Sequence, residues 1–73
     1  MINFNLRKQR AEQFRQWYDT LPTAQQKSAS KRRICATLQI TGQSFYDLLS
    51  GRVFINNYKQ KQLTALIGKE IFV

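Results

Sequence analysis

Residues 30–52 read S-K-R-R-I-C-A-T-L-Q-I-T-G-Q-S-F-Y-D-L-L-S-G-R, and this stretch decides the fold of the chain. Its apolar residues recur at helical spacing on both sides of a break at residues 39–42. They are Ile34, Cys35 and Leu38 before the break, and Phe45, Leu48 and Leu49 after it. The pattern predicts two short helices joined by a tight turn.

The second of these helices has a defined start and end. Thr41 is a good N-cap, because its hydroxyl can accept a hydrogen bond from backbone N–H groups that the first turn leaves unpaired. Gly51 follows Ser50 and can take the left-handed conformation beyond a helix end. We therefore expect a helix over about residues 42–50, with a face of amides, hydroxyls and a phenol that suits insertion into a groove. That face carries Gln43, Tyr46, Asp47 and Ser50.

Ser30–Arg52 resembles the helix-turn-helix of lambda-repressor/Cro-like DNA-binding proteins, and the likeness continues to about Gly68. Cys35 stands at the small residue of the family's first motif helix, Thr41 at its polar cap, and Ser50-Gly51-Arg52 at its ending. The resemblance covers about half of the chain. It implies an all-α fold, a small lambda-repressor-like bundle of about four helices.

Two features depart from the family pattern. The turn residue is usually glycine, whereas here it is Gln39, which must take an uncommon conformation or shift the turn geometry. In the helix after the motif, two usually apolar places hold Asn57 and Gln60. One of three neighbours is expected to fill the resulting gap: Phe54, Ile55 or Tyr58.

The resemblance also implies which residues contact DNA. In this family the second motif helix lies in the major groove, with its N-terminal part at the base edges. The residues expected at base edges are Gln43, Ser44, Tyr46 and Asp47. The residues expected at phosphates are Lys31, Arg32, Thr41, Arg52 and Asn56.

The residue types leave alternatives open at these positions. Gln43 can pair bidentately with adenine, a contact worth roughly 1–3 kcal/mol of discrimination. Asp47 can accept from a cytosine amino group or pair with Arg52, and the ion pair is slightly favoured. Tyr46 can touch a phosphate or a thymine methyl group, or pack against its neighbours. The basic run around Lys31 can hold phosphates or form a solvated face.

The N-terminal part of the chain predicts further helical structure. Residues 1–6 suggest a small edge strand or an arm, and a helix follows from about Leu6 to Thr20. Its apolar stripe is Ala11, Phe14, Trp17, Tyr18 and Leu21, and its basic face can lie along phosphates or in solvent. Thr23 and Gln26 match a capping box. The helix that starts there either runs unbroken to Leu38 or restarts at Ser30, and the lack of a strong breaker favours one helix.

The C-terminal part predicts the last helix. The apolar loop 53–55 is expected to tuck against the core. Asn56 or Asn57 caps the helix and Gly68 ends it, while Leu63, Leu66 and Ile67 form the inner face. The apolar end, residues 71–73, either covers the core or pairs with a second copy.

Composition limits both the fold and the function. Seventy-three residues are enough for one domain, which we expect to span 1–73. Twelve Lys and Arg against four Asp and Glu give a net charge of +8, which favours a polyanionic partner, nucleic acid before a membrane surface or an acidic protein. The alternative is that the positive charge forms an ordinary solvated surface that binds no partner.

Catalytic chemistry finds little support in the residue types. The chain has no histidine and one cysteine, which excludes an intrachain disulfide and argues against a metal site of the zinc-finger kind. The four carboxylates are scattered, so an acid–base site is not expected. No apolar run approaches the ~20 residues of a membrane span. We therefore expect a cytoplasmic protein that is not an enzyme and uses no cofactor, metal or small-molecule ligand.

The function that these features favour is sequence-specific binding of double-stranded DNA by a small transcriptional regulator of the repressor type. One recognition helix offers few contacts, so a homodimer is expected, with Leu49 and residues 71–73 as candidate dimer surfaces. Two alternatives remain. One is a protein-interaction module that uses the surface around Tyr46 and Leu49, and the other is charge-driven, non-specific nucleic-acid binding.

Overall fold

The computed structural model describes residues 4–72 of the chain, and these form four α-helices. The helices are α1 (Phe4–Asp19), α2 (Ala24–Leu38), α3 (Gly42–Ser50) and α4 (Asn57–Ile67). No strand occurs within the described residues. The predicted all-α fold of about four helices is confirmed.

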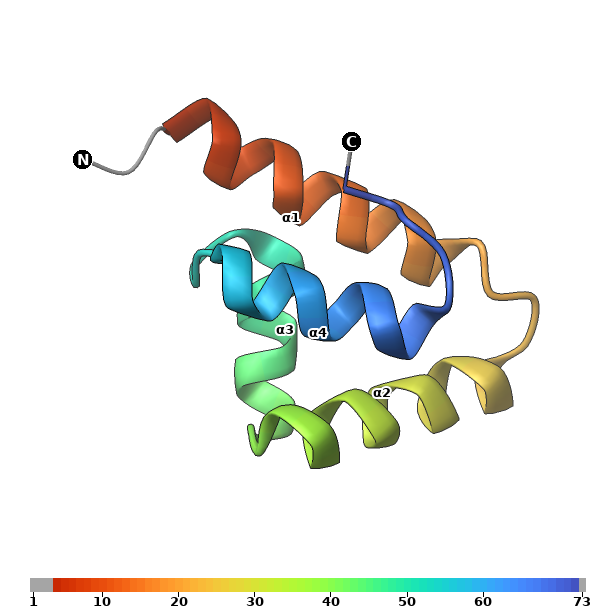
Figure 1. Cartoon of the computed structure of the whole chain (residues 1–73). Helices are drawn as coiled ribbons and strands as arrows, with labels where there is room; N and C mark the ends of the chain where they lie inside the picture. Colours follow the sequence, from red (N-terminus) through yellow and green to blue (C-terminus); the bar gives the residue numbers. More distant parts are fainter. Residues whose placement is uncertain (1–3, 73) are drawn as a thin grey trace.

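The four helices enclose a single apolar cluster. α1 packs on α3, and α2 packs on both α3 and α4. In Figure 1, α4 lies between α1 and α2, while the short α3 runs across from the end of α2 towards α1. This crossing makes α3 the element that links α1 to α2.

The core draws side chains from every helix, from the loop before α4 and from the C-terminal segment. Its buried members are Phe14, Ile34, Phe45, Leu48, Leu49, Ile55, Leu63 and Phe72. Phe45 lies at the centre, with its ring in edge-on contact with Phe14 at 5.6 Å and with Tyr18 at 5.3 Å between centroids. The aromatic stripe predicted for the first helix is thus part of the core, with Trp17 and Tyr18 half-buried at its edge.

The helix ends confirm most of the caps expected from the sequence. The Thr23 side chain accepts from the Gln26 N–H at 3.1 Å, and α2 runs unbroken from there to Leu38. Gln39 takes the left-handed conformation, with φ of 54°, which is the first of the two options that the sequence left open. Asn56, rather than Asn57, caps α4 by accepting from the Lys59 N–H at 2.8 Å.

The start of the first helix differs from the sequence prediction. α1 begins at Phe4 rather than at about Leu6, so the edge strand or arm suggested for residues 1–6 is wrong from residue 4 onward. Residues 1–3 lie outside the described residues. The helix has room to extend because Phe4, Asn5 and Leu6 include neither Gly nor Pro to stop it.

Arg10 ties α1 to the loop between α3 and α4. Its guanidinium donates to the Ile55 carbonyl at 2.7 Å and to Asn57 Oδ1 at 3.0 Å, and it lies 5.3 Å from the centre of the Phe54 ring. Ile55 is fully buried. The apolar loop therefore packs against the core as expected. Arg10, a cation on the basic face of α1, stabilises the loop through its hydrogen bonds.

Two of the residues suggested for dimer contacts are buried in the described part of the chain. Leu49 is only 8% exposed, and Phe72 is only 5% exposed. The C-terminal segment therefore covers the core, one of the two options that the sequence left open. Ile71 is half-buried against the core, and Val73 lies outside the described residues. Both corrections have one cause: α1 and the C-terminal segment fold over the apolar groups that the sequence alone leaves uncovered.

Among the described residues, none of the four helices combines the length and the apolar content that crossing a lipid bilayer requires.

Candidate nucleic-acid interface

The N-terminus of α3 is held by a complete cap. The Thr41 hydroxyl accepts from the Ser44 N–H at 3.1 Å and lies 3.2 Å from Ser44 Oγ, to which it donates. Phe45, Leu48 and Leu49 anchor one side of the helix in the core. Anchoring on that side turns the opposite side outward, which is the polar face that the sequence predicted.

The four candidate base-contact residues lie on or beside this outer face of α3. Gln43 and Tyr46 are exposed, whereas Ser44 and Asp47 are half-buried. The Gln43 amide nitrogen donates to Asp47 Oδ1 at 3.2 Å. Arg52 Nη1 lies 4.0 Å from the same oxygen. The predicted pairing of Asp47 with Arg52 is therefore present at long range, and Gln43 shares the same carboxylate oxygen.

Lys31 connects the predicted phosphate-binding helix to the outer face of α3. Its ammonium donates to the Tyr46 hydroxyl at 3.3 Å and lies 4.4 Å from the centre of the Tyr46 ring. Tyr46 also makes an edge-on contact with Phe45, with 5.7 Å between ring centroids. Tyr46 is 49% exposed, so one side of the ring packs against its neighbours and the other side faces solvent. Packing was one of the three options that the sequence left open for this residue.

A basic hollow lies between α2 and the N-terminus of α3. Its volume is about 410 Å³, and its lining is Ser28, Lys31, Arg32, Cys35 and Gly42. A Cβ atom on Gly42 would lie 3.3 Å from Lys31 Nζ, so the missing side chain leaves room for the ammonium there. The positive end of the α3 dipole and two cations thus meet in one place, which is favourable for a phosphate.

The remaining phosphate candidates are used in part by the fold. Thr41 and Asn56 hold their side-chain oxygens on helix N-termini as caps. Arg52 has a side chain that is 78% exposed, in the loop after α3. The structure therefore leaves Lys31, Arg32 and Arg52 as cations that can reach a ligand, and gives Thr41 and Asn56 a structural role first.

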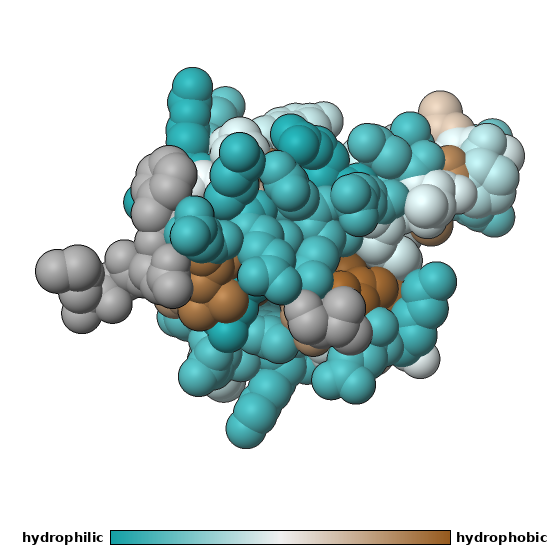
Figure 2. All heavy atoms as spheres, turned by 90° about the horizontal axis from the view of Figure 1, so that it is seen from above, coloured by the Kyte–Doolittle hydropathy of each residue, from teal (hydrophilic) through white to brown (hydrophobic). Residues whose placement is uncertain are grey.

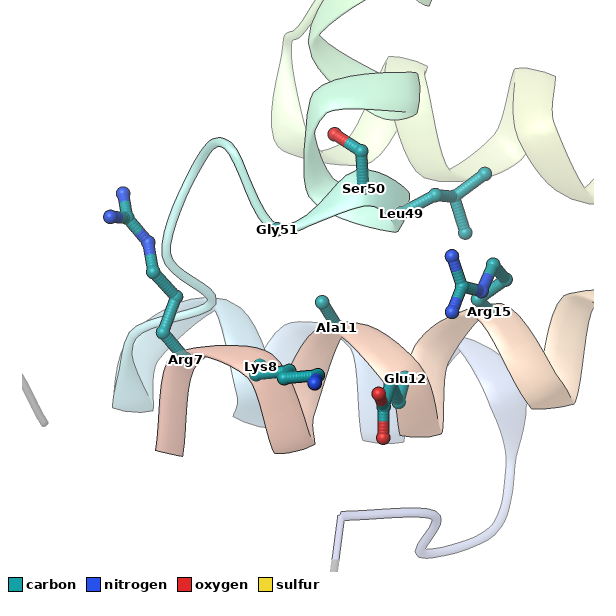
Figure 3. A pocket seen from close by; sticks show the side chains of 8 residues that line it. All are labelled: Arg7, Lys8, Ala11, Glu12, Arg15, Leu49, Ser50 and Gly51. Atoms are coloured by element: carbon teal, nitrogen blue, oxygen red, sulfur yellow. The ribbon is translucent and has the colours of Figure 1, made fainter. Parts of the chain in front are cut away.

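A second basic area lies at the other end of α3. An open groove of about 340 Å³ lies between α1 and the end of α3. Figure 3 shows the side chains that line it, which are Arg7, Lys8, Ala11, Glu12, Arg15, Leu49, Ser50 and Gly51. The Arg15 guanidinium lies beneath Leu49, and the Ala11 methyl group points towards Gly51. The approach is close, because a Cβ on Gly51 would lie 3.4 Å from the Ala11 Cβ.

Sequence reasoning did not assign this second basic area to the site. The cations of α1 carry no spacing signal that links them to residues about forty positions later, because only the packing of α1 on α3 brings them to Ser50 and Gly51. The sequence left open whether the basic face of α1 lies along phosphates or in solvent, and the structure gives its cations different surroundings. Arg10 is committed to the fold, while Lys8 and Arg15 are exposed beside the end of α3.

Tyr18 is a titratable group whose pKa is shifted by its surroundings. Burial raises its pKa above the usual value, and the neighbouring Tyr46 and Asp19 act in the same direction, while Lys31 opposes them. The phenol therefore stays protonated at neutral pH. Lys27 Nζ lies 5.7 Å from the centre of its ring, so a second lysine–tyrosine pair continues the basic surface along α2.

Comparisons of the chain with protein-family models, with curated proteins and with solved structures each find no match. The interpretation of the site therefore depends on the residues and geometry of this chain.

Proposed function

We propose that this chain binds double-stranded DNA sequence-specifically through α3, as a small transcriptional regulator of the repressor type. The observation that carries the proposal is a capped helix with a buried apolar face and an outer face of hydrogen-bonding side chains. Gln43 stands in the first turn of that face and is exposed. A helix of this kind fits the major groove, which is about 12 Å wide.

The distribution of cations supports DNA as the partner. Lys31 and Arg32 lie at the N-terminal end of α3, and Lys8 and Arg15 lie at its C-terminal end. Phosphates of both strands border the major groove, so a helix inserted there meets negative charge at both of its ends. Phosphate contacts of this sort hold the protein in register, while the outer face of α3 reads the bases.

A protein partner is less well supported at this surface. Leu49 was expected to provide the apolar part of a protein-interaction surface with Tyr46, but it is buried. Among the described residues, the large hydrophobic side chains that are exposed are Tyr46 and Tyr58. On a different face, the side of α1 seen in Figure 2, the surface is also mostly hydrophilic, with only small apolar areas. Interfaces with proteins usually need a larger apolar centre.

Charge-driven binding without sequence preference is the second candidate. The net charge of +8 favours it, and cations occur on α1, α2 and α4. The two candidates differ in one respect. Specific binding requires the outer face of α3, whereas non-specific binding requires the total charge alone.

Selection of bound duplexes from a randomised DNA library at roughly physiological salt separates the candidates. The proposal expects an enriched motif, and a palindrome would support a homodimer that reads two half-sites about one DNA turn apart. Sedimentation of the complex with the selected duplex gives the number of copies bound. Retention without an enriched motif, which disappears as salt rises, would leave only charge-driven binding.

The phosphate contacts are tested by the salt dependence of binding to the selected duplex. Replacing Lys31 and Arg32 together with Gln is expected to reduce the slope of log K against log salt by about 2, roughly one for each lost contact. Replacing Lys61 and Lys69 with Gln removes the same charge from α4 and from the segment after it, and neither residue lines the hollow or the groove at the ends of α3. An equal change of slope in both pairs would contradict the assigned phosphate contacts.

A further inference from the structure

We infer that Asp47 is a positioning residue that fixes the side-chain amide of Gln43, so that α3 selects adenine over guanine at the base that Gln43 contacts. The inference rests on the proposed function and adds to it a residue that sets specificity. It assigns the Asp47 side chain to Gln43 rather than to a base edge.

The contact that carries the inference lies within one turn of α3. Gln43 and Asp47 are four residues apart, which places their side chains on the same side of a helix. Gln43 Nε2 lies 3.2 Å from Asp47 Oδ1. Gln43 is exposed at the start of the outer face, whereas the Asp47 side chain is 25% exposed. The more buried carboxylate therefore orients the more exposed amide.

The chemistry of the carboxylate decides which end of the amide faces it. An ionised carboxylate only accepts hydrogen bonds, so the NH₂ group of Gln43 must point towards Asp47 and the amide oxygen must point away. One N–H is used in this contact. The amide oxygen and the second N–H remain for a ligand.

This pair of groups matches adenine better than guanine. In the major groove adenine offers an amino donor and the N7 acceptor, so the Gln43 oxygen can accept from the amino group while its second N–H donates to N7. Guanine offers two acceptors at the same places. To bind guanine the amide would have to turn its oxygen away, and the contact with Asp47 would be lost.

Arg52 supports the arrangement from the other side. Its Nη1 lies 4.0 Å from Asp47 Oδ1, and its side chain is 78% exposed. A pair this long and this exposed is weak. Arg52 thus biases the position of the carboxylate, and the hydrogen bond from Gln43 completes the orientation.

The experiment compares binding to two duplexes that differ at one base pair. The position is identified first, as the base pair of the selected motif at which the Gln43→Ala variant no longer prefers one base. One duplex carries A·T at this position and the other carries G·C. The wild-type chain is expected to favour adenine by roughly fivefold or more. Asp47→Ala is expected to reduce this ratio at least threefold, because the freed amide can rotate to suit either base.

The ratio is the measured quantity because removing a negative charge raises affinity for every duplex. Glu12→Gln is the matched control, since it removes a charge at the groove beside the end of α3. It is expected to leave the ratio unchanged. Asp47→Asn keeps an acceptor without the charge and is expected to fall between wild type and Asp47→Ala. Thermal unfolding of each variant verifies that the fold is retained.

The amide resonances of Gln43 provide a readout without DNA. In ¹⁵N–¹H spectra of the free protein, its side-chain NH₂ protons are expected to shift in Asp47→Ala and to stay in place in Glu12→Gln. A motif with an unchanged adenine-to-guanine ratio in Asp47→Ala would overturn the inference and leave the proposed function standing. A wild-type preference for guanine would do the same, whereas no enriched motif would overturn both.

Discussion

The two faces of α3 have opposite surroundings although they share nine residues. The inner face holds Phe45 and Leu48, which are at most 1% exposed. The outer face holds Gln43 and Tyr46, which are exposed and engaged mainly with neighbouring polar groups. The difference separates, around one short helix, the residues that hold the fold together from those proposed to bind DNA, so that a substitution on one face should leave the property of the other unchanged.

The largest effect is expected from Phe45→Ala on the inner face. Phe45 is fully buried and contacts Phe14 and Tyr18, so its loss removes apolar burial and leaves a cavity. The expected loss in the free energy of unfolding is about 3–5 kcal/mol. Urea denaturation followed by circular dichroism measures it. Tyr46→Ala, one residue along and half-exposed, is the control, and an equal loss in both would show that the two faces are not distinct.

Gln43→Ala tests the outer face and is expected to have the second-largest effect, on binding rather than on stability. The free energy of unfolding should change by no more than about 0.5 kcal/mol, because the side chain is exposed. Discrimination at the contacted base pair should fall by roughly 1–3 kcal/mol. Competition between duplexes measures the second quantity. A large loss of stability would show that the outer face also holds the fold together.

Thr41→Ala affects both faces through the helix start. The variant removes the hydroxyl that accepts from the Ser44 N–H, at an expected cost of about 1 kcal/mol in the free energy of unfolding. Thr37→Ala is the matched control, because Thr37 lies exposed inside α2 and caps nothing that the described residues show. Denaturation of the two variants side by side gives the comparison. Equal stabilities would mean that the cap contributes nothing.

The smallest effect is expected at the turn that presents α3. Gln39→Gly relieves a left-handed conformation that is unfavourable for residues with a Cβ, and the greater freedom of glycine in the unfolded chain offsets part of the gain. The net expectation is a stabilisation of a few tenths to about 1 kcal/mol. Gln16→Gly, exposed inside α1, should instead destabilise by about 0.5–1 kcal/mol. Thermal unfolding decides the two signs, and the same sign in both would contradict the argument.

Local features of the fold could be predicted from the sequence. Thr23 and Thr41 as caps and Gly51 and Gly68 as ends follow from the chemistry of adjacent residues. At Gln39 the sequence left an uncommon conformation and a shifted turn open, and the structure has the left-handed conformation. The same reasoning erred at the start of α1, because neither Gly nor Pro marks the boundary there. It also left Asn56 and Asn57 undecided as the cap of α4, since both residues have the same side chain.

The candidate site could be predicted only where its residues lie close together in the sequence, within one helix. Gln43 and Asp47 share a helix, so their common face was evident from their spacing. The second basic area was not, because Arg15 reaches the end of α3 only after α1 has packed on α3. Leu49 shows the reverse case. Its spacing from Phe45 predicted a buried apolar face, but its separate assignment as a dimer contact was wrong because the residue is buried in the core.

The sequence by itself determined most of the helices and caps and the polar face of α3, because these depend on hydrogen bonds and apolar spacing within a few residues. Only the tertiary structure decided which apolar residues are covered and which cations gather around α3. The reason is physical: burial and charge clustering depend on contacts between segments far apart in the chain. Arg10 is an example, as its bonds to Ile55 and Asn57 span more than forty residues and turn a predicted surface cation into a structural one.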